Sequence, residues 1–141
     1  MYGLLGEHLP HSFSPQIHKA LGNDSYTLFE ISPDNLEYFM TEKKFKGINV
    51  TIPYKKDVIP YLDELSPIAQ RMGSVNTIVR RSDGTLFGHN TDYFGFSSML
   101  QRSGLQLTGK KVLVLGSGGA SATASVVLQK LGANGVIISR S

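Results

Sequence analysis

Short apolar runs alternate along the chain with segments of helical periodicity, a pattern typical of an α/β fold. The apolar runs in the first two thirds of the chain predict strands at residues 2–6, 26–31, 46–50, 75–80 and 85–88. Serine, proline and glycine signals predict helices between them, at residues 14–22, from 32 and from 53 onward, at 64–72 and at 92–103. We therefore expect an α/β domain of three layers with a mixed sheet.

The pattern changes after residue 104. Residues 110–116 are a continuous apolar run of the parallel-strand type, followed by a glycine-opened helix and a second buried strand at 135–139. This βαβ pattern predicts the start of a Rossmann-type sheet, which normally needs about six strands. We assign residues 1–104 to the first domain and 105–141 to an incomplete dinucleotide-binding domain. An incomplete sheet leaves an open edge, which would favour pairing with another chain, as in a homodimer.

A glycine-rich turn joins the predicted strand and helix of this second region, and it consists of Gly116, Ser117, Gly118, Gly119 and Ala120. This context is the one that a dinucleotide fingerprint requires. Gly116 suits a tight turn, Gly118 lets the backbone approach a pyrophosphate, and the helix start offers unpaired N–H groups. The alternative is a turn that only joins strand and helix, which the matching flanks disfavour.

The second strand of this region ends in Ser139-Arg140-Ser141, and no acidic residue follows Asp92. An acid at this strand end would bind the ribose 2′-hydroxyl of NAD, whereas an arginine pairs with the 2′-phosphate of NADP. The sequence therefore favours NADP. A solvated Arg140 with no ligand is the alternative.

The charge is distributed unevenly along the chain. The net charge is +3, but residues 1–92 carry −2 and residues 93–141 carry +5. A basic second region favours a polyanionic ligand. Because basic and aromatic residues do not interleave and no helix-turn-helix pattern is present, a nucleotide cofactor is favoured over nucleic acid. A merely solvated basic surface is the alternative.

The composition is that of an ordinary globular protein, with 40% hydrophobic and 18% charged residues in 141. The absence of cysteine excludes disulfides and thiolate metal sites. The four histidines lack a carboxylate at ligand spacing, so we expect no metal. With no signal-like segment and no apolar run of membrane-spanning length, we expect a cytoplasmic protein without membrane contact.

Two serines near the start of the chain are candidates for binding a carboxylate. Ser12 and Ser14 flank Phe13, and in an extended segment their hydroxyls would share one side while Phe13 faces the core. The alternative is that Ser14 is only the N-cap of the helix that follows.

Three further residues are candidates for chemistry on the substrate. Lys55 lies where a helix is expected to start at Pro53, and an ammonium disfavoured at that helix end is a better proton carrier. The alternative is a solvated pair with Lys56. Asn76 is a polar residue in an apolar strand, so it either faces a cleft at the strand end or is a satisfied core amide. Capping of the next helix could explain Asn90, Thr91 and Asp92, and the alternative makes Asp92 the carboxylate partner of Lys55.

The order GLLG, HSFSP, GINVTIPYK, VNT, HNTD and GSGGAS resembles the shikimate dehydrogenase family along the whole chain. The resemblance implies a substrate-binding domain followed by an NADP-binding domain, and reduction of 3-dehydroshikimate to shikimate in aromatic amino acid biosynthesis. It implies that Ser12 and Ser14 bind the substrate carboxylate, that Thr51, Asn76 and Asp92 bind its ring hydroxyls, and that Lys55 and Asp92 are the catalytic pair. The glycine-rich turn would bind the pyrophosphate, and Ser139 with Arg140 the 2′-phosphate.

The sequence departs from the family pattern at three positions: Tyr93 replaces a common glycine, Lys19 a frequent asparagine, and Ser139 the usual asparagine. The family is about twice this length. Two alternatives to an active dehydrogenase therefore stay open. One is a fragment that binds shikimate or quinate without redox chemistry, and the other is a truncated product without activity of its own.

Overall fold

The computed structural model describes residues 1–140, apart from the burial of Gly119. Ser141 of the strand-end motif lies outside the described residues. The chain divides into two compact units, Met1–Asn90 and Thr91–Ser141. Each unit is a separate body. The helix at 92–103, which the sequence analysis counted with the first domain, belongs to the second of these units.

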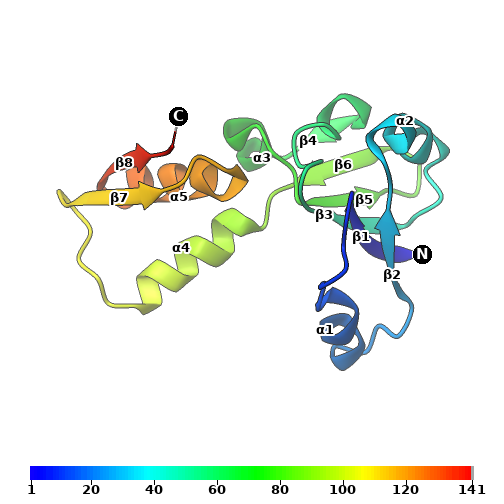
Figure 1. Ribbon diagram of the computed structural model, residues 1–141, viewed down its shortest axis with the longest axis horizontal. Helices are drawn as coiled ribbons and strands as arrows, with labels where there is room; N and C mark the ends of the chain where they lie inside the picture. The colour runs from blue at the N-terminus through cyan, green and yellow to red at the C-terminus, as the bar shows by residue number, and fades with distance from the viewer. Residues whose placement is uncertain (141) are drawn as a thin grey trace. The chain divides into compact units, whose positions relative to one another are not determined.

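The first unit contains a six-stranded mixed sheet in the order β2-β1-β3-β5-β6-β4 (Figure 1). Its strands are β1 (Tyr2–Gly6), β2 (Tyr26–Glu30), β3 (Gly47–Val50), β4 (Glu64–Leu65), β5 (Thr77–Arg80) and β6 (Leu86–His89). Only β5 runs against its neighbours, being antiparallel to β3 and to β6. The carboxyl ends of β1, β3 and β6 therefore meet the start of β5 at one edge of the sheet. This confirms the expected mixed-sheet α/β domain.

Three α-helices and one short 3₁₀-helix accompany this sheet, and they are α1 (Ser14–Ala20), α2 (Pro33–Glu42), η1 (Ile59–Tyr61) and α3 (Pro67–Met72). The main core lies on the face that carries Leu5, Ile48 and Val50, where Leu36 and Met40 of α2 pack. Alternate residues of the same strands point to the opposite face, as the two-residue period of a strand requires. A smaller cluster of Leu4, Leu9 and Tyr26 covers that face.

The helix expected from Pro53 does not form, and that prediction was wrong. Residues 52–58 are a series of turns, with the amide of Tyr54 bonded to the Thr51 carbonyl at 2.9 Å. The Lys55 carbonyl accepts a hydrogen bond from the Val75 amide at 2.7 Å. Because that carbonyl is already paired with an amide just before β5, it is not available to propagate a helix.

The single helix expected over residues 64–72 is divided in two. Glu64 and Leu65 pair with β6 as the short strand β4. The helix starts only after Ser66, whose side chain accepts a hydrogen bond from the Ala69 amide at 3.2 Å. An N-cap serine followed by proline is a strong helix start, and it separates strand from helix at this point.

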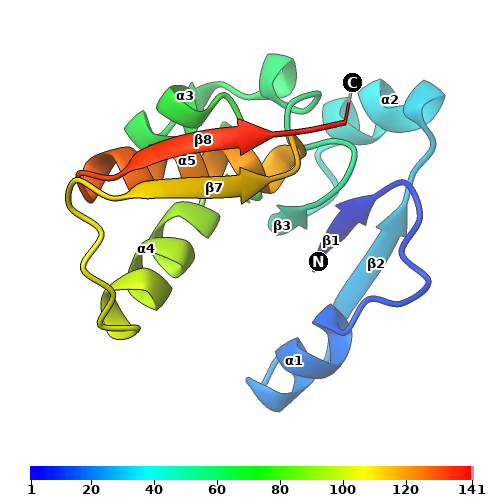
Figure 2. The same ribbon diagram turned by 60° about the vertical axis from the view of Figure 1, so that its left-hand side comes forward.

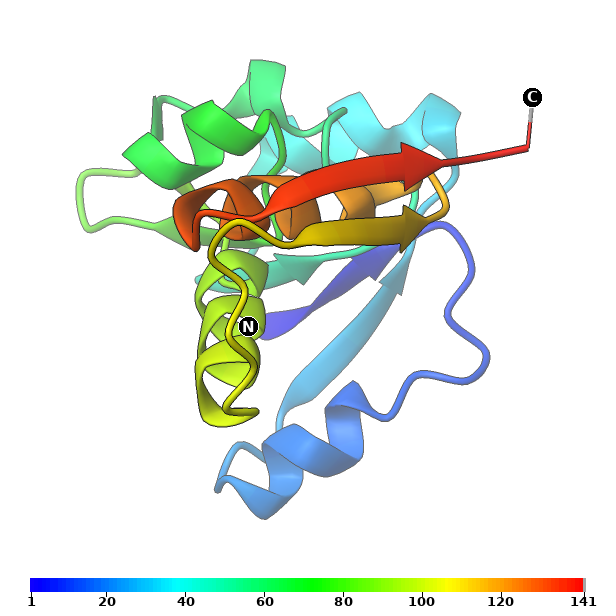
Figure 3. The same ribbon diagram turned by 90° about the vertical axis from the view of Figure 1, so that its left-hand side faces the viewer.

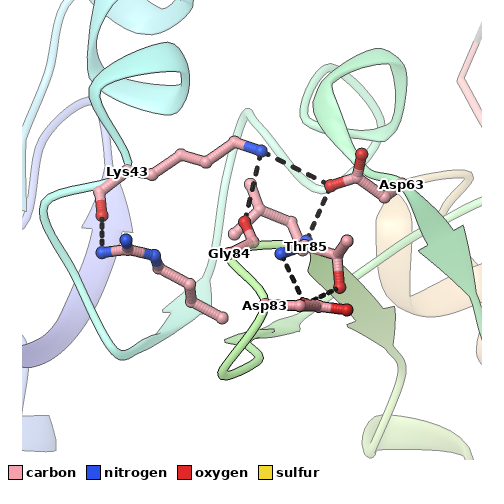
Figure 4. Close-up of polar contacts among 7 residues, drawn as sticks. Lys43, Asp63, Asp83, Gly84 and Thr85 are labelled. Carbon is pink, nitrogen blue, oxygen red and sulfur yellow. Dashed lines mark hydrogen bonds and ion pairs between the residues drawn. The ribbon is translucent and has the colours of Figure 1, made fainter.

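A polar cluster closes the turn between β5 and β6 onto the end of α2 (Figure 4). Lys43, the left-handed residue that ends α2, directs its ammonium to the Asp63 carboxylate at 3.5 Å and to the Gly84 carbonyl at 3.4 Å. Asp63 also accepts a hydrogen bond from the Leu86 amide at 2.7 Å, and this bond, followed by the charge of Lys43, lowers the pKa of Asp63. Asp83 accepts two bonds from Thr85, as expected of a tight hairpin turn.

The second unit contains α4 (Asp92–Arg102), β7 (Lys111–Leu115), α5 (Gly119–Lys130) and β8 (Asn134–Ile138). Strands β7 and β8 pair in parallel, from Lys111 with Asn134 to Leu115 with Ile138. Figure 2 and Figure 3 show the two strands side by side with α5 packed along them. This confirms the expected βαβ arrangement of a Rossmann-type start. The expectation that its second strand is buried was wrong, because every residue of β8 is exposed.

Gly3 of β1 provides a test of the packing between β1 and β2. A Cβ atom at Gly3 would lie 2.2 Å from the Thr27 carbonyl oxygen and 2.4 Å from the Phe29 ring. Because backbone cannot yield as a flexible side chain does, we expect Gly3→Ala to lower the free energy of unfolding by about 3 kcal/mol. The control is Gly95→Ala in α4, where a Cβ meets nothing within 4 Å and alanine favours the helix. Urea denaturation followed by circular dichroism measures both, and a Gly3→Ala variant as stable as the wild type contradicts this packing.

Candidate functional site

The loops at the carboxyl edge of the first unit's sheet bring together three of the predicted site residues. Thr51 follows β3, and its amide bonds to the Leu5 carbonyl of β1 at 2.9 Å. Asn76 precedes β5, and its carbonyl accepts from the Val50 amide of β3 at 2.8 Å. The bond between Val75 and Lys55 places the lysine turn beside the same residues. Ligands commonly bind outside the carboxyl ends of strands, so Thr51, Lys55 and Asn76 occupy a suitable edge.

Lys55 differs from its neighbour in its surroundings. Its side chain is half-buried whereas Lys56 is exposed, so a simple pair of solvated lysines does not describe both. Because no α-helix starts at Pro53, the argument from a helix dipole does not apply to Lys55. The turn is held instead by Tyr54, which is 1% exposed and donates its hydroxyl to the Ile31 carbonyl at 2.5 Å. Burial, with a smaller contribution from nearby carboxylates such as Glu7, raises the pKa of Tyr54.

The sequence analysis did not single out Tyr54. The sequence did contain an indication of its role, because a tyrosine directly before the candidate lysine can hold the turn in place when its hydroxyl bonds to a buried acceptor. The acceptor lies after β2, however, and could be identified only from the fold.

Asn76 is buried, with 8% of its surface exposed, and it lies just before β5 rather than inside it. Its Oδ1 accepts a hydrogen bond from the Thr77 hydroxyl at 3.0 Å. The amide oxygen is thus bonded, as in the second interpretation, and the role of Asn76 beside a cleft stays a prediction.

The two candidate serines lie in a segment that departs from the expected geometry. Phe13 is 72% exposed and has helical backbone angles, so the prediction of an extended segment with Phe13 in the core was wrong. Phe13, rather than Ser14, is the N-cap of α1, and Ser14 is its first residue. The Ser14 amide donates to the Ser12 hydroxyl oxygen at 3.3 Å. Ser12 and Ser14 are each half-buried, and they lie at the end of the segment that joins β1 to α1.

Asn90 is a structural residue of this edge that the sequence analysis had explained only by capping. It is fully buried at the end of β6, and its Nδ2 donates to the Ser74 carbonyl at 3.1 Å and to the Ser74 hydroxyl at 3.0 Å. The N-cap of α4 is Thr91, whose side chain makes no capping bond. Capping therefore does not account for Asn90, which instead ties the end of β6 to the segment that leads into β5.

In the second unit, Asp92 and the glycine-rich turn line one cavity of about 770 Å³. Asp92 is the first residue of α4 and is half-buried. Gly116, Gly118 and Ala120, next to or within the start of α5, line the same cavity. The predicted catalytic carboxylate and the predicted cofactor turn therefore share a cavity large enough for a small-molecule ligand.

The turn has the backbone geometry that a dinucleotide requires. Gly116 has φ +106°, which favours glycine, and its amide bonds to the Ile138 carbonyl of β8 at 2.8 Å. Gly118 is the extended N-cap of α5, with no side chain to block the free N–H groups of the helix start. Ala120 belongs to the first turn of this helix. The residues of the turn therefore fit a pyrophosphate.

The end of β8 lies beside this turn. The hydroxyls of Ser117 and Ser139 are 2.8 Å apart, and Ser139 and Arg140 line a hollow of about 550 Å³ together with Gly116. The strand end predicted to read the 2′-phosphate is thus adjacent to the turn predicted to bind the pyrophosphate, and Ser139 and Arg140 are exposed.

Within residues 1–140, no group of three or more His, Asp or Glu side chains is arranged to hold a metal ion. Within the same residues, no helix combines the length and the apolar character needed to cross a bilayer.

Comparison with known proteins places these features in a family. Residues 4–78, more than half of the chain, match the family model of the shikimate dehydrogenase substrate binding domain. A protein of Clostridium beijerinckii named shikimate dehydrogenase (NADP(+)) is 45% identical, with 85% of this chain and 47% of the relative aligned. A protein of the same name from Carboxydothermus hydrogenoformans is 43% identical over 98% of this chain and 52% of its own. The chain spans about half the length of the curated relatives it matches.

Solved structures give the same result. Shikimate dehydrogenase from Aquifex aeolicus is 38% identical with a TM-score of 0.90, over 99% of this chain and 55% of that one. Shikimate 5-dehydrogenase from Thermus thermophilus, solved in complex with NADP(H) and shikimate, is 36% identical with a TM-score of 0.86, over 99% and 56% of the two chains.

The role of Asn90 as a structural tie is testable by substitution. We expect Asn90→Ala to lower the free energy of unfolding by about 2 kcal/mol, because the buried carbonyl and hydroxyl of Ser74 lose their donor. The control is Asn35→Ala, an exposed amide that bonds only to the Ser32 hydroxyl at 2.9 Å, for which we expect about 0.5 kcal/mol. Chemical denaturation measures the difference, and equal losses in the two variants would contradict a structural role for Asn90.

Proposed function

Because this chain belongs to the shikimate dehydrogenase family, we propose that it binds shikimate with its first unit and NADP with its second, and supplies Lys55 and Asp92 to the reversible reduction of 3-dehydroshikimate. The observation that most directly supports the proposal is the cavity of the second unit, which is lined by both Asp92 and the glycine-rich turn. A carboxylate and a pyrophosphate-type turn in one cavity suit an enzyme that brings a hydroxylated substrate to a dinucleotide.

The substrate-binding role rests on polar groups at the carboxyl edge of the first sheet and in the segment between β1 and α1. Ser12 and Ser14 provide hydroxyl donors for the carboxylate of shikimate, and Thr51 and Asn76 provide hydrogen bonds to its ring hydroxyls. A polyhydroxylated ring acid requires this mixture, because each buried hydroxyl must be paired on binding.

The cofactor-binding role rests on the backbone of the turn at Gly116 and on the strand end at Arg140. The turn binds pyrophosphate through N–H groups, and Arg140 pairs with the 2′-phosphate, with Ser139 beside it. When bound, NADPH supplies the hydride for the carbonyl carbon. No acidic side chain follows Asp92 in the sequence, so no carboxylate of β8 repels a 2′-phosphate.

Proton transfer falls to the side chains. The half-buried ammonium of Lys55 gives its proton to the oxygen that becomes the hydroxyl of shikimate, and in the reverse direction its amine removes that proton. Asp92 accepts a hydrogen bond from a substrate hydroxyl and so orients the ring. The step balances in atoms and charge, because one hydride and one proton are added to one carbonyl group.

Calorimetric titration of the 141-residue chain tests both binding roles. We expect heat from shikimate, and tighter binding of NADPH than of NADH. Arg140→Gln should weaken NADPH binding about tenfold and leave NADH binding unchanged, since only the charged pair to the 2′-phosphate is lost. The control is Arg102→Gln, an exposed arginine at the end of α4. Heat from shikimate alone would favour a binding fragment without redox chemistry, and heat from neither ligand with a folded chain would overturn the proposal. Quinate in parallel measures selectivity.

Substitution of the lysine tests the chemical role. In an active protein that contains this chain, Lys55→Ala should lower kcat by roughly 10²–10⁴ with a modest change in KM, because the proton donor is lost while most binding contacts remain. The matched control is Lys56→Ala, the exposed neighbour in the same turn, which should leave kcat unchanged. A loss below tenfold for Lys55→Ala is evidence against its assignment as the proton donor.

A further inference from the structure

Four polar side chains, three of them from the strands β2, β3 and β5, form a continuous chain of hydrogen bonds that ends at Asn76 just before β5. The Tyr26 hydroxyl donates to Asn49 Oδ1 at 2.7 Å, Asn49 Nδ2 donates to the Thr77 hydroxyl oxygen at 3.3 Å, and the Thr77 hydroxyl donates to Asn76 Oδ1 at 3.0 Å. None of these bonds is local except the last. This series of hydrogen bonds crosses the sheet from its edge strand β2 to the start of β5.

The register of the sheet explains why these residues meet. Asn49 of β3 pairs with Leu4 of β1 on one side and with Thr77 of β5 on the other. Leu4 packs with Tyr26 in the small cluster on that face. Because residues paired across a sheet share a face, Asn49 and Thr77 lie on the same side as Tyr26. The large ring of Tyr26 then reaches over β1 to Asn49.

The hydrogen bonds of this series all donate in one direction, toward Asn76. Asn49 Oδ1 accepts from the phenol, so its Nδ2 points to Thr77, and it also donates to the Asn76 carbonyl at 3.5 Å. The Thr77 hydroxyl accepts this bond with its lone pair and donates its proton onward to Asn76 Oδ1. With Oδ1 facing Thr77, the Nδ2 group of Asn76 is the end of the amide directed away from the chain. Burial raises the pKa of Tyr26 to about 12, so the phenol remains a donor at any working pH.

We propose that Tyr26, Asn49 and Thr77 are positioning residues that fix the amide of Asn76 with its Nδ2 as the donor to a ring hydroxyl of the substrate. The identity of the substrate rests on the proposed function. An amide that is free to flip offers a donor or an acceptor at nearly equal energy, whereas a held amide offers only one. Holding the amide before binding also avoids the entropy cost of ordering it in the complex.

The ring of Tyr26 has a separate structural task. It stacks on His18 of α1, with ring centroids 3.7 Å apart and an angle of 10° between the planes. No residue of α1 is buried, and this stack is a contact between α1 and the edge strand β2. Tyr26→Phe removes the hydroxyl and keeps the ring, which separates loss of the hydrogen-bond chain from loss of the α1 attachment.

Each variant that breaks the series of hydrogen bonds has a matched control that does not. Tyr26→Phe and Thr77→Val each remove one hydroxyl and keep the shape of the side chain. Thr77→Ser keeps the hydroxyl and is the conservative rescue. Tyr38→Phe removes a phenol from an exposed position of α2 and is the control. Circular dichroism and a denaturation curve establish that each variant is folded.

The first measurement is the affinity of the 141-residue chain for shikimate, by calorimetry or by titration followed by nuclear magnetic resonance. We expect Tyr26→Phe and Thr77→Val to weaken binding about threefold to tenfold, the usual effect of one hydrogen bond. Thr77→Ser and Tyr38→Phe should stay within about twofold. Binding of 1-cyclohexenecarboxylate, which keeps the ring and carboxylate but has no hydroxyls, should be the same in all five proteins. An equal loss for both ligands would indicate general loosening and overturn the proposal.

The second measurement does not depend on the ligand. In ¹⁵N-labelled protein, the side-chain amide signals of Asn76 should shift in Tyr26→Phe and in Thr77→Val, and should return toward the wild-type position in Thr77→Ser. Unchanged Asn76 signals in the first two variants overturn the positioning role. Failure of the wild-type chain to bind shikimate overturns instead the proposed function, so the two ideas fail on different observations.

Discussion

The hydrogen bond from the Val75 amide to the Lys55 carbonyl is the contact on which the arrangement of the first unit's edge depends. It ends the turn after β3 by occupying a carbonyl that a helix would need. It also returns the chain to the same edge, where it enters the sheet as β5, antiparallel to β3. Asn76 is thereby set beside Val50, one residue before Thr51. One backbone contact thus fixes the spacing of an amine, an amide and a hydroxyl that come from separate segments.

The sequence predicted those features that are determined by neighbours in the chain. Five of the six strands of the first sheet and the βαβ segment were predicted because alternation and apolar runs are local signals, whereas the short strand β4 was taken for helix. The glycine-rich turn was predicted for the same reason, since a positive φ at Gly116 and an open helix start at Gly118 require only the residues of the turn itself. The assignment of individual residues to substrate or cofactor stays a prediction.

Features that depend on a distant partner were missed or wrong. The helix expected at Pro53 failed because Lys55 is bonded to Val75, and no local pattern reveals that partner. Asn90 looked like a capping residue because its true partner, Ser74, is on another segment. Phe13 was placed in the core by alternation, but alternation applies only to extended backbone and Phe13 is helical. Tertiary hydrogen bonds overrode local preference in two of these cases, and a wrong backbone assumption explains the third.

The charges of the second unit give a physical reason to connect Asp92 with the substrate rather than the cofactor. Asp92 is the only acidic residue after position 83, while the remaining charged residues after it are all basic. A carboxylate in the same cavity as the glycine-rich turn opposes the binding of phosphates there. Its position in the first turn of α4 offsets part of the cost of that charge, because the helix dipole favours an anion. The remaining unfavourable effect on phosphate binding is offset if Asp92 accepts a hydrogen bond from a neutral hydroxyl of the substrate, which a basic side chain in its place cannot do.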